Sequence, residues 1–391
     1  MPRFSHHDAV PRTIYFDYNA TTPLDPAVRA AMLPLLDHAW GNPSSVHHVG
    51  QRARALLDDA RDRAAVLLGA KPSELIFTSG GTESNNLAIF GAARSLKSKG
   101  KHLITSAVEH DAVLQGFDYL EKREGFEVTR LPVDAAGRVS VESFQHALRP
   151  DTVFVSIMAA NNEIGTLQPA SEIGALCQER KIVFHTDAVQ WFGKEPVANL
   201  SHFNANLVSI CAHKFHGPKG AGLLYIRSPL HLDPIFFGGG HENEQRAGTE
   251  NLISIFGLVA ALERFVKTPV FEAVKLSAFR SRLRQGIATV EGCELVSPAE
   301  GCLSNTVSFV VSGADSIALL AGLDMEGICA SSGSACSAGS LEPSHVILAL
   351  GKPSLANSLV RFSLGRDSTS EEVEAVCRVL PEIIGRARPG R

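Results

Sequence analysis

The 391-residue sequence has few cysteines, no excess of either charge and no long apolar run. Its seven cysteines form an odd, scattered set without a C-x-x-C pair, which is typical of neither a disulfide framework nor a zinc site, so we expect reduced thiols in the cytoplasm. The 37 basic and 41 acidic residues leave a net charge of −4 without a charged tail, so we expect neither nucleic acid nor anionic lipid as a partner. No segment approaches roughly 18 uninterrupted apolar residues, and residues 1–13 lack the apolar part of a signal peptide, so we expect neither export nor a membrane span.

Two widespread nucleotide-binding motifs are missing as well. Neither G-x-G-x-x-G nor G-x-x-x-x-G-K-[ST] occurs, so the sequence indicates no dinucleotide or nucleoside triphosphate. The spacing of His213 and His216 could suit a metal ion, but no third ligand of suitable spacing accompanies them. We therefore expect no metal site.

What is present is the composition of a globular protein, with 45% hydrophobic and 20% charged residues, and a length that allows two or three domains of roughly 150 residues. Short apolar runs alternate with helical stretches, which predicts an α/β domain with a mainly parallel sheet over residues 17–260. The predicted strands lie at 75–78, 103–106, 153–158, 182–186, 207–211 and 222–226. Helices are expected from Asp25-Pro26 onward, over 50–69 and over 250–266.

The pattern changes in the C-terminal part of the chain. Two predicted strands are interspersed with amphipathic helices, which indicates a smaller α+β domain. The strands lie near 305–311 and 359–364, and the helices near 315–323, 342–350 and 370–386. We assign residues 1–16 and 261–391 to this smaller domain.

The segment 79–82, Ser-Gly-Gly-Thr, joins the first predicted strand to a helix. Glycines such as Gly81 let the backbone approach an anion, and a helix N-terminus offers N–H groups and a favourable dipole. A phosphate group would therefore suit Thr82. The alternative is that Thr82 only caps the helix and the glycines make a tight turn.

Two charged residues end predicted strands further along the chain. Asp187 closes the run 182–186, and ligands of open α/β sheets lie off such strand ends, although an Asp there can also cap a turn. Lys214 follows the run 207–211 and opens a glycine- and proline-rich loop. A partly desolvated lysine can form a Schiff base, although a lysine in a loop can also simply reach solvent.

These features, in this order, resemble the fold type I enzymes that use pyridoxal 5′-phosphate, in the class V aminotransferase group, and among them the cysteine desulfurases of the housekeeping and nitrogen-fixation type. The resemblance extends from YFDYNATTP at 15–23 to RFSLGR at 361–366. Its most specific part is SSGSACS at 331–337, followed by SLEPSHV at 340–346, which is similar to the catalytic-cysteine loop of that family. The small polar neighbours of Cys336 suit an exposed loop, here about 329–341, better than a core.

The resemblance implies a seven-stranded, mainly parallel sheet and a role for each matching residue. Lys214 would hold the cofactor covalently and act as the base, Asp187 would pair with the pyridine nitrogen, His110 would stack on the ring, and Cys336 would accept sulfur. The cofactor phosphate would bind Gly81, Thr82 and His213, Asn162 and Gln190 would contact the 3-oxygen, and Arg361 with Asn162 would bind the substrate. Thr249, in RAGT at 246–249, would reach the phosphate of the neighbouring subunit in a homodimer.

The implied reaction converts L-cysteine to L-alanine and passes the sulfur through a Cys336 persulfide to an iron–sulfur scaffold or a sulfur carrier for tRNA thiolation. Two positions depart from the family pattern. Cys211 stands where relatives usually place a phosphate-binding Ser, and a thiol is a weaker donor than a hydroxyl. Trp191 stands where relatives generally have a small residue.

Other readings remain open. A β-lyase or an aminotransferase of the same fold would share Lys214, Asp187 and Thr82, but it would have no use for the loop that carries Cys336. A selenocysteine lyase could use the same site. A non-catalytic partner in a sulfur-transfer complex would have no reason to keep Lys214, Asp187, Arg361 and Cys336 together.

Overall fold

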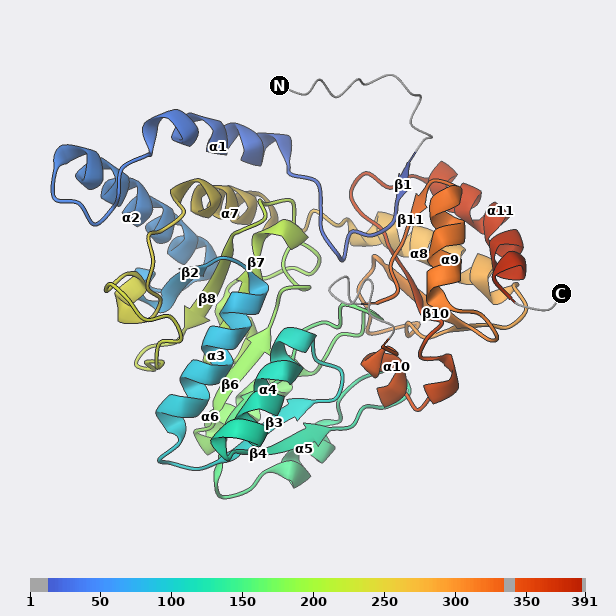
Figure 1. The fold of residues 1–391 in the computed structure, drawn as a ribbon, viewed down its shortest axis with the longest axis horizontal. Helices are drawn as coiled ribbons and strands as arrows, with labels where there is room; N and C mark the ends of the chain where they lie inside the picture. Colours follow the sequence, from blue (N-terminus) through green and yellow to red (C-terminus); the bar gives the residue numbers. More distant parts are fainter. Residues whose placement is uncertain (1–12, 334–341, 389–391) are drawn as a thin grey trace.

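The computed structural model describes residues 13–333 and 342–388, and Figure 1 shows their elements as two groups side by side. The first group is built on a seven-stranded sheet in which only β8 runs against the other strands. In spatial order its strands are β2 (Leu75–Thr78), β8 (Gly222–Ile226), β7 (Leu207–Cys211), β6 (Val183–Asp187), β5 (Thr152–Ser156), β3 (His102–Ser106) and β4 (Glu127–Leu131). The α/β fold with a mainly parallel sheet is thereby confirmed.

Helices cover both faces of this sheet because its strands alternate their side chains between two apolar clusters. On β2, Ile76 enters the cluster formed with helices α3 (Gly81–Leu96) and α4 (Asp111–Glu124). Its neighbour Phe77 enters the cluster on the opposite face. The helices of that opposite face are α5 (Val141–Ala147), α6 (Ala170–Arg180) and α7 (Leu252–Phe265), with α1 (Pro26–His38) and α2 (His48–Leu68) packed on α7.

The local sequence explains where the outer helices begin and end. Asp25 caps α1 by accepting hydrogen bonds from the main-chain N–H groups of Ala27 and Val28 at 2.9 and 3.3 Å, as the Asp-Pro pair predicts. Helix α2 ends at Gly69, whose φ of 65° is the left-handed conformation that glycine adopts without a steric penalty.

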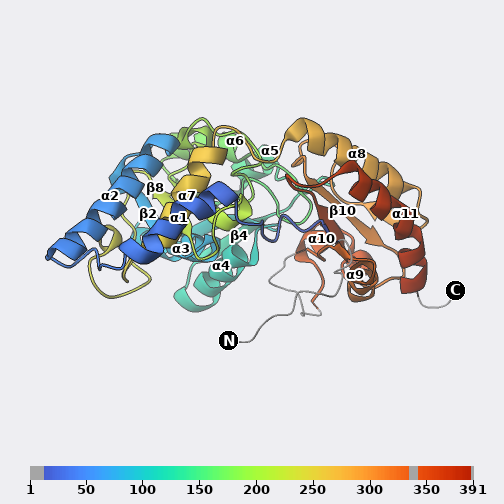
Figure 2. The ribbon, with the colours of Figure 1, turned by 90° about the horizontal axis from the view of Figure 1, so that it is seen from above.

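The second group of elements contains a three-stranded antiparallel sheet in the order β12-β10-β9. The strands of this sheet are β9 (Cys293–Leu295), β10 (Thr306–Val311) and β12 (Val360–Ser363). The helices of the second group are α8 (Ala273–Ala288), α9 (Ser316–Met325), α10 (His345–Ala349) and α11 (Ser370–Ala387). Helices α8 and α11 pack together beside β10, as the view from above shows (Figure 2). The N-terminal strand β1 (Ile14–Tyr15) pairs in parallel with β11 (Ile328–Cys329) in this group. The domain division at residues 16 and 260 stays a prediction.

The predicted strands and helices are present with small shifts at their ends, whereas the sequence analysis gave no range for the strands β1, β4, β9 and β11 or for the helices α4, α5, α6 and α8. Strand β4 lies at the edge of the sheet and carries the charged side chains of Glu127 and Arg130, so it is not an apolar run. Helix α8 is similarly rich in arginine and has only four buried residues. Within the described residues, no helix is both long and apolar enough to cross a membrane.

Candidate active site

A cavity of about 160 Å³ lies at the carboxyl ends of the central strands, where the two groups of elements meet. Parallel strands place their following loops at one edge, and ligands of such sheets bind there. The cavity brings together ten of the residues that the sequence analysis selected. They are Gly81, Thr82, His110, Asn162, Asp187, Gln190, Cys211, His213, Lys214 and Arg361.

One end of the cavity is formed by the N-terminus of α3, which follows β2 directly. The N-cap is Gly80 and no side chain caps the helix, so the alternative in which Thr82 serves as the N-cap is wrong. A Cβ added to Gly81 would lie 2.8 Å from Cγ2 of Val189, so only glycine lets the backbone pass this close to the cavity wall. A helix start without a side-chain cap and lined by Gly81 and Thr82 suits a phosphate group.

Asp187, the last residue of β6, is held rigidly with both carboxylate oxygens occupied. Oδ2 accepts a 2.6 Å hydrogen bond from Nδ2 of Asn85, and Oδ1 accepts a 2.9 Å bond from the main-chain N–H of Val189. Asp187 is 5% exposed and lines the cavity, so its negative charge is available to a positively charged group of a bound ligand. Such a carboxylate can keep the nitrogen of a pyridine ring protonated.

Lys214 enters the cavity from the short 3₁₀ helix Ala212–Lys214, which follows β7. Its amine donates hydrogen bonds to the main-chain oxygens of Asn19 and Ala20 at 2.7 and 2.9 Å. These acceptors belong to the segment between β1 and α1. The amine is therefore directed by backbone oxygens into a half-buried site, as a Schiff-base lysine requires.

His213 and Cys211 line the same wall as neutral groups. Burial, with a contribution from Lys214, lowers the pKa of His213 to about 4, and Nδ1 lies 3.1 Å from Oγ1 of Thr21. Burial raises the pKa of the Cys211 thiol, whose sulfur faces the main-chain oxygen of Ala221 at 3.8 Å. An anion bound here would therefore meet hydrogen-bond donors rather than a second negative charge.

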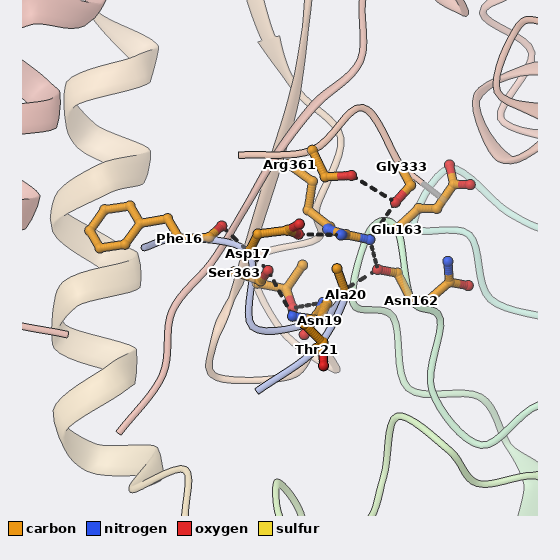
Figure 3. Close-up of polar contacts among 12 residues, drawn as sticks. Phe16, Asp17, Asn19, Ala20, Thr21, Asn162, Glu163, Gly333, Arg361 and Ser363 are labelled. Carbon is orange, nitrogen blue, oxygen red and sulfur yellow. Dashed lines mark hydrogen bonds and ion pairs between the residues drawn. The ribbon is translucent and has the colours of Figure 1, made fainter. Parts of the chain in front are cut away.

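Arg361, on β12, is the basic group of the opposite wall and is 1% exposed. Figure 3 shows its guanidinium reaching the segment between β1 and α1. Nη2 donates to Oδ1 of Asp17 at 2.7 Å, and Nη1 donates to the main-chain oxygens of Asn162, at 2.8 Å, and Gly333. Nε has no partner among the described residues, so this buried cation keeps an unused donor.

Four residues of the site were missed by the sequence analysis: Asn19, Asn85, Glu109 and Lys194. Asn85 had a signal, because it lies three residues after Thr82 and so shares its face of α3. Glu109 is fully buried beside His110, accepts hydrogen bonds from Ser106 and Met158, and has its pKa raised to about 8 by burial and by Asp187. Asn19 and Lys194 meet only through long-range folding, and nothing local marks them.

Three positions from the sequence analysis remain to be placed. Thr249 does not line this cavity, but lies with Ser79 and Arg246 around a second one. Cys336 falls outside the described residues. The indole of Trp191 is directed away from the cavity and packs on His202 and Phe203, with ring centres 5.3 and 5.5 Å away, so the bulky residue leaves the cavity open. In the described part of the chain, no group of three or more His, Cys, Asp or Glu side chains is arranged to hold a metal ion.

Comparison with known proteins agrees with this geometry. The class-V aminotransferase family matches residues 14–376. A cysteine desulfurase IscS of Dictyoglomus turgidum is 46% identical over 379 residues, which cover 96% of both chains. Among solved structures, a NifS-like protein superposes with a TM-score of 0.88 at 36% identity, over 96% of this chain and all of the other. A structure described as SspA in complex with cysteine has a TM-score of 0.79 at 36% identity, over 91% of this chain and all of the other.

The chain therefore belongs to the class-V aminotransferase family, whose enzymes depend on pyridoxal phosphate. Within it, the chain is an enzyme of the cysteine desulfurase group to which IscS and NifS belong. The cavity fits the cofactor, because it offers an uncapped helix N-terminus for the phosphate, Asp187 for the ring nitrogen and the amine of Lys214.

Proposed function

We propose that this enzyme converts L-cysteine to L-alanine and transfers the sulfur to the thiol of Cys336. The observation that carries the proposal is the single cavity in which the N-terminus of α3, Asp187, Lys214 and Arg361 meet. The solved relative described as a complex with cysteine supports the choice of substrate.

The roles that we propose for the cavity residues are those that the family resemblance implies. When bound through Lys214, the cofactor supplies an electron sink next to the substrate Cα. Asp187 keeps the pyridine nitrogen protonated, and its bonds from Asn85 and Val189 prevent the carboxylate from turning away. His110 would contact the ring of the cofactor. Thr82, His213 and the main chain at Gly81 would hold the phosphate, and Asn162 and Gln190 would bind the 3-oxygen.

Arg361 and Lys214 act on the substrate. Arg361 binds the cysteine carboxylate with its planar guanidinium, which is already aligned by Asp17 and by the main chain of Asn162. The amine of Lys214 would be the general base that removes the Cα proton of the substrate.

The sulfur step balances without an external oxidant. The Cys336 thiolate attacks the substrate sulfur, so that an S–S bond forms while the Cβ–S bond breaks. The electron pair of the broken bond remains on the three-carbon fragment, which takes up a proton at Cβ, regains the proton at Cα and leaves as L-alanine. The persulfide sulfur then passes to an acceptor protein, either an iron–sulfur scaffold or a carrier for tRNA thiolation.

The proposal includes a homodimer in the cytoplasm. Thr249 lies away from the cavity of its own chain, which is consistent with a contribution to the phosphate site of the partner. Large apolar side chains are exposed on and after α1 and in the segment before α7, namely those of Leu36, Trp40, Val46 and Phe237, and an interface would bury them. The six described cysteines are free thiols, as a reducing compartment requires.

The deciding experiment measures alanine and sulfide released from L-cysteine in the presence of a thiol reductant, for wild type and Cys336→Ala. Equal amounts of both products from wild type, lost in the variant while its cofactor absorption band remains, support the proposal. Pyruvate and ammonia from wild type would instead indicate a β-lyase. A rate with L-selenocysteine that persists in Cys336→Ala would show a selenocysteine lyase activity that does not need this thiol.

A further inference from the structure

Lys194 is a buried amine beside the cavity for which the reaction described above has no use. It is 2% exposed, and its Nζ donates to Oδ1 of Asn19 at 2.9 Å and to Oε1 of Gln190. Its third neighbour is the ring of Phe271, whose centre lies 5.4 Å from Nζ. Both polar partners are neutral amides, and no carboxylate in the described part of the chain pairs with this amine.

Burying an amine without a counter-ion is unfavourable, and a methionine would fill the same space without that penalty. A lysine at this position therefore indicates that its hydrogen bonds serve a function. The backbone is also shaped to turn Lys194 inward. Gly193 has a φ of 76°, and a Cβ on it would lie 2.4 Å from Cβ of Phe215, the residue after Lys214. The turn at 193–194 therefore packs closely against the loop that follows Lys214.

The two hydrogen bonds of Gln190 determine the orientation of its side-chain amide, that is, which partner faces the oxygen and which faces the NH₂ group. Oε1 accepts from Lys194, and Nε2 donates to the main-chain oxygen of Asn19 at 2.9 Å. The reversed amide would direct its NH₂ group at the Lys194 amine and its oxygen at the Asn19 oxygen. Because Gln190 lines the cavity, the second hydrogen of Nε2 is the one left for a ligand.

We propose that Lys194 is a positioning residue that holds the Gln190 amide with its NH₂ group toward the cavity, as a donor to the negatively charged 3-oxygen of the cofactor. This inference rests on the proposed placement of pyridoxal phosphate. With the cofactor held by Lys214, its 3-oxygen would share a proton with the linking nitrogen. A donor on the 3-oxygen therefore lowers the pKa of that nitrogen.

Asn19 offers a competing route, since it touches both amines. Its main-chain oxygen accepts from Lys214 at 2.7 Å, and its Oδ1 accepts from Lys194 and from Nδ2 of Asn305 at 3.0 Å. Loss of Lys194 could act through this residue rather than through Gln190. The experiment has to separate the two routes.

The test is a pH titration of the visible absorption band of the bound cofactor, without any substrate. Lys194→Met removes the donor at nearly constant volume, and we expect the midpoint of the titration to rise by roughly 0.5 to 1 pH unit, as the loss of one hydrogen bond implies. Gln190→Leu is expected to raise the midpoint similarly. Adding Lys194→Met to Gln190→Leu is expected to change it little, because the amide to be oriented is gone.

Several outcomes would overturn the inference. An unchanged midpoint in Lys194→Met would do so, and so would full additivity in the double variant, which would assign the effect to Asn19 or to the charge alone. If Lys194→Met does not fold, Gln190→Glu takes its place, because the new carboxylate can pair with Lys194 but cannot donate to the 3-oxygen. An unchanged midpoint in that variant would equally exclude the role of the Gln190 donor.

The matched control is Lys267→Met, which makes the same substitution at an exposed lysine. The residue before it, Val266, is fixed by a main-chain hydrogen bond from Val197. Its midpoint is expected to equal that of wild type. A wild-type protein without a visible cofactor band would count against the proposed function itself, whereas a wild-type band with no response to the variants would count against the role of Lys194 alone.

Discussion

Asp17 and Arg361, 344 positions apart in the chain, form a 2.7 Å ion pair at the wall of the cavity (Figure 3). Asp17 follows β1, and Arg361 belongs to β12, so the pair joins the two ends of the chain. The ion pair does not use every donor of the guanidinium, because Nε of Arg361 has no hydrogen-bond partner among the described residues. The pair therefore orients Arg361, whose side chain also lines the cavity.

The first prediction concerns substrate affinity. Arg361→Lys keeps the charge and can keep contact with Asp17, but it loses the planar, bidentate geometry that matches a carboxylate. We expect the KM for L-cysteine to rise roughly 10- to 100-fold, with a smaller change in kcat. Steady-state kinetics check this, and an unaltered KM would place the substrate carboxylate elsewhere.

The ion pair also illustrates what could be predicted from the sequence and what could not. Strands β2, β7 and β8 are short, buried and mostly apolar, so their residues could be identified one by one. The charged groups that follow such strands, Asp187 and Lys214, were recognisable because charge at the end of a buried strand needs a partner.

Contacts between residues far apart in the chain could not be predicted from the local sequence. Asn19 accepts from Lys214 and Lys194, which lie 195 and 175 positions away, and no spacing or periodicity records such a meeting. The same applies to the short pairing of β1 with β11. The roles assigned from family resemblance do not depend on those contacts, which is why the residues that line the cavity could be selected before their supports were known.

The second prediction concerns the support of Asp187. Asn85→Ala removes the 2.6 Å hydrogen bond to Oδ2, so the carboxylate gains freedom to turn from the ring nitrogen. We expect kcat to fall roughly tenfold, and Asp187→Asn, which removes the charge itself, to lower it by roughly 10²- to 10⁴-fold. Gln178→Ala, which removes an exposed amide on α6 that donates to the main-chain oxygen of Asn204, serves as the control. Equal rates for Asn85→Ala and the control would show that Asp187 needs no such support.

The third prediction concerns the pH dependence of stability. Burial raises the pKa of Glu109 to about 8, so the folded protein keeps the carboxyl protonated while the unfolded chain, with a value near 4.5, releases the proton. The stabilisation from this group is therefore present below pH 4.5 and is lost as the pH rises from 4.5 to 8. Glu109→Gln removes the titrating group, so we expect it to exceed wild type in stability at pH 8 by about 1–3 kcal/mol and to differ less at pH 5.

Urea unfolding of both proteins at pH 5 and pH 8 measures this difference. Glu179→Gln, at an exposed position on α6, provides the control and is expected to follow the wild-type pH profile. Parallel profiles for wild type and Glu109→Gln would mean that Glu109 is ionised in the folded protein, against the direction that its burial implies.

The last prediction concerns cofactor affinity at Cys211, where the chain departs from the usual serine. The thiol is buried and protonated, lines the cavity and lies 3.8 Å from the main-chain oxygen of Ala221, with the main chain of Gly81 and His213 also in contact with its sulfur. A hydroxyl is a stronger donor than a thiol, so Cys211→Ser adds a hydrogen bond to the cofactor phosphate. We expect the Kd for pyridoxal phosphate to fall roughly 3- to 10-fold, because one net hydrogen bond is worth about 1 kcal/mol.

Equilibrium binding to the cofactor-free protein, followed by the visible band, measures this affinity. Cys377→Ser makes the same chemical change on α11, away from the cavity, and is expected to leave the Kd unchanged. A Kd that rises in Cys211→Ser would show that the surroundings are adapted to sulfur, since the shorter C–O bond would then withdraw the donor from the phosphate rather than present it. In that case Cys211 would bind the phosphate better than a serine could at this position.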